Sequence, residues 1–260
     1  MRSIAIMNQK GGVGKTTTAV NLAAALADAG QRVCLIDLDP QSHATLHLGL
    51  DPRPEQTSIY DVLTRDARFS QAVRPVDERL AVAGSTLDLA AAEMELAGVV
   101  GREVILRDAL RADPPEVDYL LIDCPPSLGL LTLNALAAVR EVFIPMQPHF
   151  LALHGLSKLL ETLRLVAMRL NSDLRLSGVV FCMYDTGTRL AAEVVGDVES
   201  FLAASRGTDV PWSDTRLMAT RIRRNIRLAE APSFGQSIFQ YAADSHGAED
   251  YRSLADEVAR

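Results

Sequence analysis

The feature that most constrains this chain is a glycine-rich stretch near its start, QKGGVGKTTT. An apolar run, Ser3–Met7, precedes it and is typical of a buried strand. A helical pattern over Lys15–Ala29 follows it, with Gly30 as an end signal. Glycines between a strand and a helix N-terminus leave backbone N–H groups free to surround an anion. The stretch therefore predicts a phosphate-binding loop.

The spacing departs from the common phosphate-loop pattern, because Gln9 stands where the first glycine is expected. In this loop Lys15 can reach the β- and γ-phosphates, and the Thr16 hydroxyl can bind Mg²⁺. A compact ammonium suits a tight loop better than a guanidinium fork, and the chain has only one further lysine, Lys158, besides Lys10. The predicted nucleotide contacts in the loop are Gly11, Gly12, Val13, Gly14, Lys15, Thr16 and Thr17.

Apolar, β-branched runs alternate with helical patterns along the whole chain. Strands are expected over residues 3–7, 32–37, 80–83, 118–123, 141–146 and 174–183, and helices over 15–29, 87–99, 129–138, 154–170 and 191–204. Strands that are apolar on both faces and separated by helices indicate an α/β fold with a mostly parallel, twisted sheet covered on both sides. With 260 residues, 48% of them hydrophobic, and no linker, the chain is expected to form a single domain, 1–260.

Two acidic segments follow predicted strands. Asp37 ends the second strand and Asp39 lies just beyond it, while Asp123 ends the strand DYLLID. Ligand sites of α/β sheets assemble at the carboxyl ends of the strands, so these side chains are candidates for the same site as the phosphate loop. Pro125 and Pro126 then favour an extended exit from the strand.

The segments KGGVGKTT, CLIDLDPQSHAT and DYLLIDCPPSLG resemble three motifs of the ParA/MinD superfamily of deviant Walker A ATPases. This resemblance implies a P-loop NTPase fold, ATP hydrolysis, and ATP with Mg²⁺ as cofactors. It also implies that Lys10 is the signature lysine, which crosses a dimer interface to the partner's nucleotide, while Lys15 serves its own site. The catalytic residues it implies are Lys10, Lys15 and Asp39, and the metal-binding residues are Thr16, Asp39 and Asp123.

In the same resemblance, Asp39 positions or activates the attacking water, Asp37 supports the loop or the metal shell, and Asp123 holds Mg²⁺ through water. The segment FCMYDTGTRLAAEVV resembles the family segment beside the adenine, which makes Met183 and Tyr184 candidates for base contacts. Packing in the core or at its rim is the equal alternative for each of these two residues.

A basic segment, RIRRNIRLAEAPSFG, resembles the family segment IPRNVRLSEAPS, which contacts DNA without sequence preference. The resemblance places the DNA contact at Arg224, helped by Arg221, Arg223 and Arg227; a solvated face is the alternative. Arg223 stands where the family usually has proline. The net charge of −7 means that any DNA contact must come from a local patch. A further departure is an inserted loop at about 203–214, which contains Trp212 and would pack on the body or contact a partner.

Together these resemblances imply a ParA/Soj-type ATPase that forms an ATP-dependent homodimer on nonspecific double-stranded DNA. A ParB-like or adaptor protein would stimulate hydrolysis, and the protein would be cytoplasmic and associated with the nucleoid, without a membrane partner. The alternatives are a ParA-like ATPase that positions a protein cargo over the nucleoid, and a MinD-like membrane-cycling ATPase, against which the acidic C-terminal segment speaks. An electron-transfer ATPase would need cysteines placed to hold an iron–sulfur cluster between subunits. Cys124 and Cys182 have no visible partner cysteines for such a cluster. A nucleotide-sensing structural protein would not need Lys15, Asp39 and Asp123.

Overall fold

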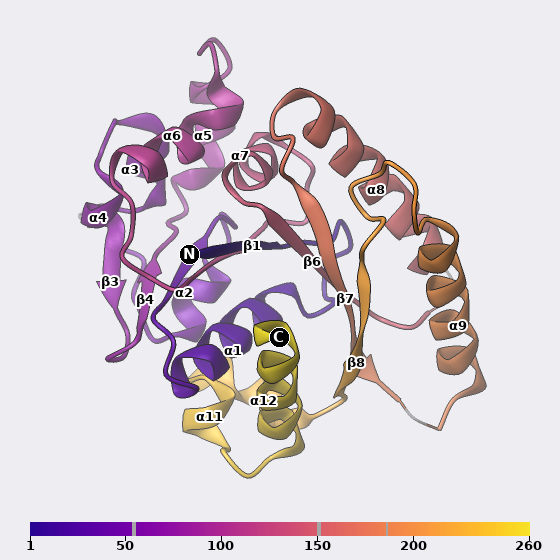
Figure 1. Cartoon of the computed structure of the whole chain (residues 1–260). Coiled ribbons are helices and arrows are strands. Elements are labelled where there is room, and N and C mark those ends of the chain that lie inside the picture. Colours follow the sequence, from indigo (N-terminus) through magenta and orange to yellow (C-terminus); the bar gives the residue numbers. More distant parts are fainter. Residues whose placement is uncertain (54–55, 150–151, 186) are drawn as a thin grey trace.

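The computed structural model describes residues 1–53, 56–149, 152–185 and 187–260, and a largely parallel sheet forms its centre (Figure 1). In these residues eight strands pair in the order β3-β4-β2-β5-β1-β6-β7-β8, and only the β3–β4 pair is antiparallel. The strands are β1 (Arg2–Ile6), β2 (Val33–Asp37), β3 (Val73–Pro75), β4 (Leu80–Ala83), β5 (Tyr119–Asp123), β6 (Glu141–Met146), β7 (Arg175–Tyr184) and β8 (Arg216–Arg223).

Alternation along the central strands divides the core into two hydrophobic clusters, one on each face of the sheet. On β2, Cys34 and Ile36 belong to one cluster, whereas Val33 and Leu35 belong to the other. The strands β1 and β5 alternate in the same way, and every residue of β2 and β5 is buried. Burial on both faces is the reason why these segments read as almost continuous apolar runs in the sequence.

The helices cover both faces. Helices α3 to α9 contribute to the cluster that contains Ile36, and α1, α2, α10, α11 and α12 contribute to the opposite cluster (Figure 1). The helices are α1 (Lys15–Asp28), α2 (His43–His47), α3 (Ile59–Thr64), α4 (Phe69–Ala72), α5 (Leu89–Glu95), α6 (Ile105–Ala112), α7 (Leu130–Ala138), α8 (Ala152–Arg169), α9 (Arg189–Ala204), α10 (Ile226–Glu230), α11 (Ile238–Tyr241) and α12 (His246–Ala259), with short 3-10 turns η1 (Arg102–Val104) and η2 (Ala231–Phe234).

The expected fold class is confirmed, and each of the six expected strands is present within two residues of its expected bounds. The expected helix over 87–99 is wrong in its extent, since α5 ends at Glu95 and the chain continues in turns. Gly98 and Gly101 weaken any helical continuation there. The strands β3 and β8 were not expected from the sequence. The strand β8 is hidden by its arginines, because only Met218 and Ile222 on it are buried.

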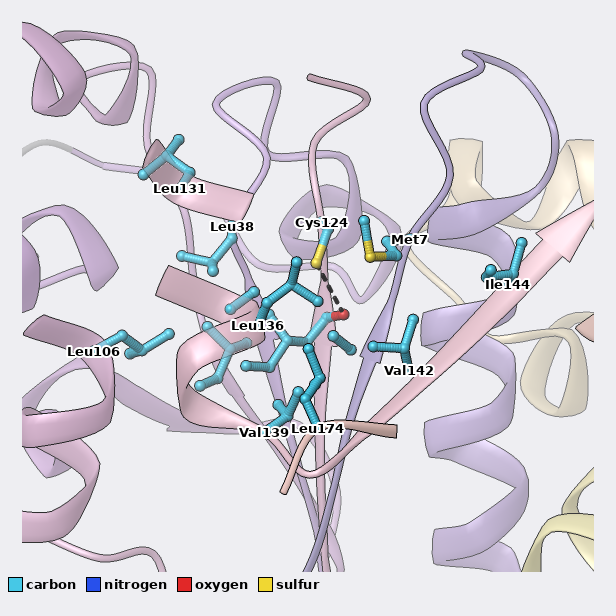
Figure 2. Packing of buried hydrophobic residues seen from close by; sticks show 14 of the residues in the cluster. Met7, Leu38, Leu106, Cys124, Leu131, Leu136, Val139, Val142, Ile144 and Leu174 are labelled. Carbon is cyan, nitrogen blue, oxygen red and sulfur yellow. Dashed lines mark hydrogen bonds between the residues drawn. The ribbon is translucent and has the colours of Figure 1, made fainter. Parts of the chain in front are cut away.

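All three cysteines are buried and free. Cys124 lies at the carboxyl end of β5 among Met7, Leu38 and Leu136 (Figure 2). Burial raises the pKa of the Cys34 and Cys182 thiols to about 12. A buried neutral thiol is a weak nucleophile, so these cysteines are packing residues of the core.

The segment that contains Trp212 packs back onto the domain. The indole Nε1 of Trp212 donates to Ser205 Oγ at 3.1 Å, and its ring lies against the cluster that contains Ile36. The carbonyl of Pro211 accepts a hydrogen bond from the backbone of Leu176 at 2.8 Å. Packing on the body, one of the two expectations for this segment, is therefore what the structure shows.

Gly178 on β7 tests the packing between the sheet strands. A methyl group at this position would press into the buried Phe143 ring and lie 2.6 Å from Met218 Cε. We expect Gly178→Ala to lower the free energy of unfolding by about 1–3 kcal/mol, as overpacking does in closed cores. Gly196→Ala is the matched control, because Gly196 is an exposed position of α9 with nothing within 4 Å of an added methyl group, and the change should stabilise the protein by up to about 1 kcal/mol. Urea denaturation measures both; equal effects would contradict the packing argument.

Candidate active site

The phosphate loop connects the end of β1 to the start of α1. Gly12 and Gly14 have φ angles of 71° and 94°, in the left-handed region that favours glycine, and Gly14 directly precedes the helix. The Lys15 side chain is buried, and its Nζ donates to the carbonyl of Lys10 at 3.2 Å. Burial lowers the pKa of Lys15, and the carboxylates of Asp123 and Asp39 oppose that shift. The loop thus holds the Lys15 ammonium group close to its own glycine-rich backbone.

Asp123 is a fully buried carboxylate at the end of β5, and within the described chain neither of its oxygens has a hydrogen-bond partner. Burial, followed by the charge of Asp37, raises its pKa well above the usual range, while Thr16 and Lys15 lower it in part. A buried acceptor without a partner is costly, and it marks a place where a ligand completes the structure.

Asp37 lies opposite Asp123 in the register of β2 and β5, and it is better satisfied. Its Oδ2 accepts from the backbone N and the Oγ1 of Thr45 at 2.8 and 2.7 Å, and its Oδ1 accepts from the Asp39 backbone N at 3.1 Å. Burial raises the pKa of Asp37 to about 6, and these hydrogen bonds lower it in part. Asp39 itself is nearly buried and accepts from the Gln41 backbone.

This donor set suits Mg²⁺. Carboxylate and hydroxyl oxygens are its preferred ligands, and it commonly keeps waters and phosphate oxygens rather than a complete protein cage. Accordingly, among the described residues no group of three or more His, Cys, Asp or Glu side chains forms such a cage. Asp123, Asp39 and Thr16 are the residues that would hold the ion, and the unpaired oxygens of Asp123 are the observation that supports this.

A cavity of about 1030 Å³ opens beside the loop and the carboxylates. Its volume is at the upper end of the roughly 300–1,000 Å³ of ligand pockets. Lys15, Thr16, Thr17 and Asp39 line it, as do residues that the sequence analysis did not assign: Gln41, His43, Pro125, Pro126, Ser127, Cys182, Ile222, Asn225, Ile226, Leu228 and Tyr251. The resemblance of the 221–235 segment to a DNA-contacting segment masked its second role as a cavity wall, and no sequence signal pointed to Tyr251.

The two candidates for base contacts differ in position. Met183 lines the cavity and has a φ angle of 50°, an uncommon conformation for a non-glycine residue, at an irregularity in the pairing of β7 with β8. Tyr184 is not among the residues that line the cavity, and its carbonyl accepts from the Arg224 backbone at 3.4 Å. Val13 is also outside the lining, because its side chain is buried beneath the loop.

Lys10 lies apart from the cavity that its own loop forms. Its side chain is exposed, and its Nζ lies 2.6 Å from His149 Nε2, beyond the end of β6. The phosphate-loop glycines Gly11 and Gly12 line the cavity, whereas Lys10 does not. Only Lys15, of the two loop lysines, is therefore directed at the chain's own site.

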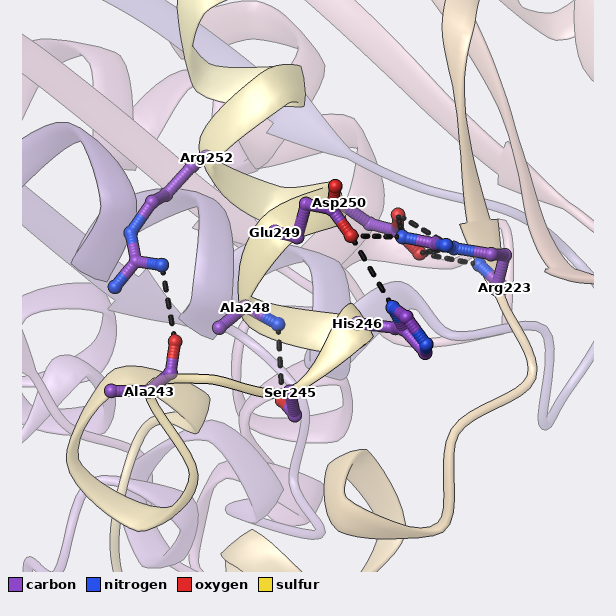
Figure 3. Close-up of polar contacts among 8 residues, drawn as sticks. All are labelled: Arg223, Ala243, Ser245, His246, Ala248, Glu249, Asp250 and Arg252. Atoms are coloured by element: carbon purple, nitrogen blue, oxygen red, sulfur yellow. Dashed lines mark hydrogen bonds and ion pairs between the residues drawn. The ribbon is translucent and has the colours of Figure 1, made fainter.

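The four arginines predicted to contact DNA have different surroundings. Arg223 binds Asp250 and Glu249 of α12, with closest distances of 2.6 and 2.7 Å (Figure 3). The Arg221 guanidinium lies 5.4 Å from the centre of the Phe181 ring, and Arg227 pairs with Glu230 at 2.9 Å. Arg224 is exposed, and within the described ranges no carboxylate pairs with its guanidinium.

Fold and site together define a phosphate-loop nucleotide-binding protein of the α/β class. A family model described as an AAA domain (AAA_31) matches residues 1–176. The chain is 47% identical to the sporulation initiation inhibitor protein Soj of Bacillus subtilis over 257 residues, covering 98% of this chain and 97% of that protein. It is 48% identical to the chromosome-partitioning ATPase Soj of Thermus thermophilus over 258 residues, covering 99% and 95%. The chain belongs to the ParA/Soj family of chromosome-partitioning ATPases.

Solved structures agree with this assignment. A crystal structure described as cobyrinic acid a,c-diamide synthase from Mycobacterium smegmatis, with a bound ATP analogue and magnesium, is similar with a TM-score of 0.83 and 37% identity, and the match covers 100% of this chain and 95% of that one. The cell division ATPase MinD of Pyrococcus furiosus shares the fold with a TM-score of 0.78 at 24% identity, covering 99% and 98%. In the described part of the chain, no helix is long and apolar enough to cross a membrane.

The unpaired carboxylate of Asp123 generates a prediction about stability. We expect Asp123→Asn to raise the melting temperature of the nucleotide-free, metal-free protein at pH 8, because the change keeps the size of the side chain and removes a buried carboxyl group whose oxygens accept no hydrogen bond. The same variant should lose the stabilisation that Mg²⁺ with ADP gives the wild type. Asp256→Asn, an exposed change on α12, is the control and should alter neither quantity. An unchanged melting temperature together with full Mg²⁺–ADP stabilisation would contradict this reading of Asp123.

Proposed function

We propose that the chain binds ATP with Mg²⁺, dimerises in that state, binds double-stranded DNA without sequence preference, and moves a chromosome or plasmid with a ParB-like partner that stimulates hydrolysis. The observation that carries the proposal is the buried, unpaired Asp123 carboxylate next to Lys15 at the phosphate loop. The identity of 47–48% to Soj proteins supports partitioning over other uses of the same fold. The protein would act in the cytoplasm on the nucleoid.

Each residue of the site has a role in this proposal. Lys15 and the backbone of Gly12 and Gly14 bind the phosphates, and Asp39, nearly buried at the cavity wall, orients the attacking water. Asp123 and Thr16 would hold Mg²⁺, which would supply positive charge to offset that of the phosphates. Asp37 holds the Asp39 backbone in place through its hydrogen bond.

The outward position of Lys10 supports its proposed action on the partner's nucleotide. Its exposed side chain lies outside its own cavity, beside His149, and from there it can reach across an interface. Hydrolysis should then be slow in the monomer, because one cation of the site comes from the other protomer. A ParA-like ATPase that positions a protein cargo would use the same site. The identity of the partner protein, ParB-like or another adaptor, distinguishes this function from DNA partitioning.

We expect alanine substitutions of Lys15 and Lys10 to impair different steps, and Lys158→Ala to serve as the control. Lys15→Ala should weaken ATP binding about 10–100-fold, because a charged hydrogen bond contributes about 1.5–3 kcal/mol. Lys10→Ala should leave ATP binding by the monomer unchanged and impair ATP-dependent dimerisation and turnover. Lys158→Ala, on the exposed surface of α8, should change none of these. Calorimetry and size-exclusion chromatography with ATP measure them, and an equal loss of ATP affinity in the Lys10 and Lys15 variants would exclude the trans role of Lys10.

DNA binding should depend on Arg224. Two protomers that each neutralise about three phosphates engage about six, so the affinity of the ATP dimer should fall about a thousandfold between 50 and 200 mM salt. Arg224→Glu should abolish that binding and keep the dimer, whereas Arg206→Glu, the same charge change on another exposed surface, should reduce it only slightly. Filter binding to unrelated duplexes tests this. Equal affinity with and without ATP, or wild-type binding by Arg224→Glu, would remove DNA from the proposal.

A further inference from the structure

The short helix α2 lies between the carboxylates and the arginine-bearing segment. Its residue Thr45 is almost completely buried and makes two hydrogen bonds to one oxygen of Asp37, at 2.8 Å through the backbone and 2.7 Å through the hydroxyl. The same hydroxyl accepts from the Ser85 backbone at 3.0 Å. Thr45 thus fixes α2 to Asp37 at the end of β2, two residues before Asp39.

The other end of α2 meets the segment that follows the arginines. Gly49 and Gly235 have φ angles of 74° and 63°, and their backbones touch: a methyl group on Gly235 would lie 2.7 Å from Gly49 Cα, and one on Gly49 would lie 3.0 Å from the Gly235 carbonyl oxygen. Beside them the buried ring of His47 lies against the backbone of Gln236. Burial lowers the pKa of His47 to about 4, so this contact remains uncharged at neutral pH.

A contact of backbone with backbone leaves no flexible side chain to absorb a displacement, and close-packed interiors transmit strain. The stretch 231–236 does not line the cavity beside the phosphate loop, whereas residues 222–226, 228 and 229 do. A ligand that shifts Asp37 or Asp39 can therefore reach 231–236 through α2 without touching it.

We infer that α2 is a connector between the phosphate site and the arginine-bearing segment 224–235, with Thr45 as the positioning residue at one end and the Gly49–Gly235 contact at the other. The inference rests on the proposed function, since the ligand is ATP with Mg²⁺ and the output is the presentation of Arg224 to DNA. If α2 has two arrangements, ATP with Mg²⁺ can shift the balance between them only as far as its affinity differs between the two.

The first test is hydrogen exchange of the amides in 231–236, with and without a saturating, nonhydrolysable ATP analogue and Mg²⁺. We expect the analogue to change their exchange in the wild type and in Thr45→Ser, which keeps the hydroxyl. Thr45→Val, of nearly equal size, should lose this change while still binding the analogue, because Thr45 is outside the cavity lining. No change in the wild type, or the full change in Thr45→Val, would overturn the inference.

The second test is the ratio of DNA affinities with and without the analogue. We expect Gly235→Ala to reduce this ratio at least about fivefold, the lower end of ordinary coupling. Gly207→Ala is the matched control, because its φ angle of 74° imposes similar strain and nothing lies within 4 Å of it. Equal ratios in the two variants would overturn the inference; if Gly235→Ala is unfolded, the Thr45 variants decide. If the analogue leaves the DNA affinity of the wild type unchanged but still changes hydrogen exchange in 231–236, the proposed function is refuted and the connector inference is supported.

Discussion

The structure depends on one costly arrangement, the burial of Asp123 opposite Asp37 at the ends of two central strands. Two carboxylates this close disfavour one another's charge, and burial raises both pKa values. Thr45 satisfies Asp37, and Asp123 is left with Lys15 as the nearby cation. The parallel register of β2 and β5 maintains this arrangement, so in the proposed function the sheet sets where Mg²⁺ would bind, beside the phosphate loop.

The phosphate loop and the cavity wall are built at the carboxyl ends of the same sheet. Glycines at positive φ allow the loop to turn above Lys15, and the irregular pairing of β7 with β8 places Met183 at the cavity. Because β8 then leads directly into α10, residues such as Asn225 border the same cavity as the loop. The segment proposed for DNA contact is consequently a wall of the nucleotide site, and the two functions share one piece of backbone.

The sequence predicted the features that local pattern determines. Continuous apolar runs marked the six inner strands, and the spacing around Lys15 marked the phosphate loop. It did not predict β8, because an edge strand that buries only Met218 and Ile222 resembles a charged surface loop. Nor could it show Thr45 beneath Asp37, since that contact depends on how α2 folds back on the sheet.

The arginines show why composition alone is a poor guide to this surface. Arg223 adds positive charge to the segment, yet it binds two carboxylates of α12 and fastens that helix to the end of β8 (Figure 3). Arg227 is likewise offset by Glu230, so within the described residues Arg221 and Arg224 are the arginines of this segment that no carboxylate pairs with. On a chain with a net charge of −7, two such residues give little attraction for a polyanion. In the proposed function, strong binding would therefore require that two copies present their patches together, and dimerisation would be the step that controls access to DNA.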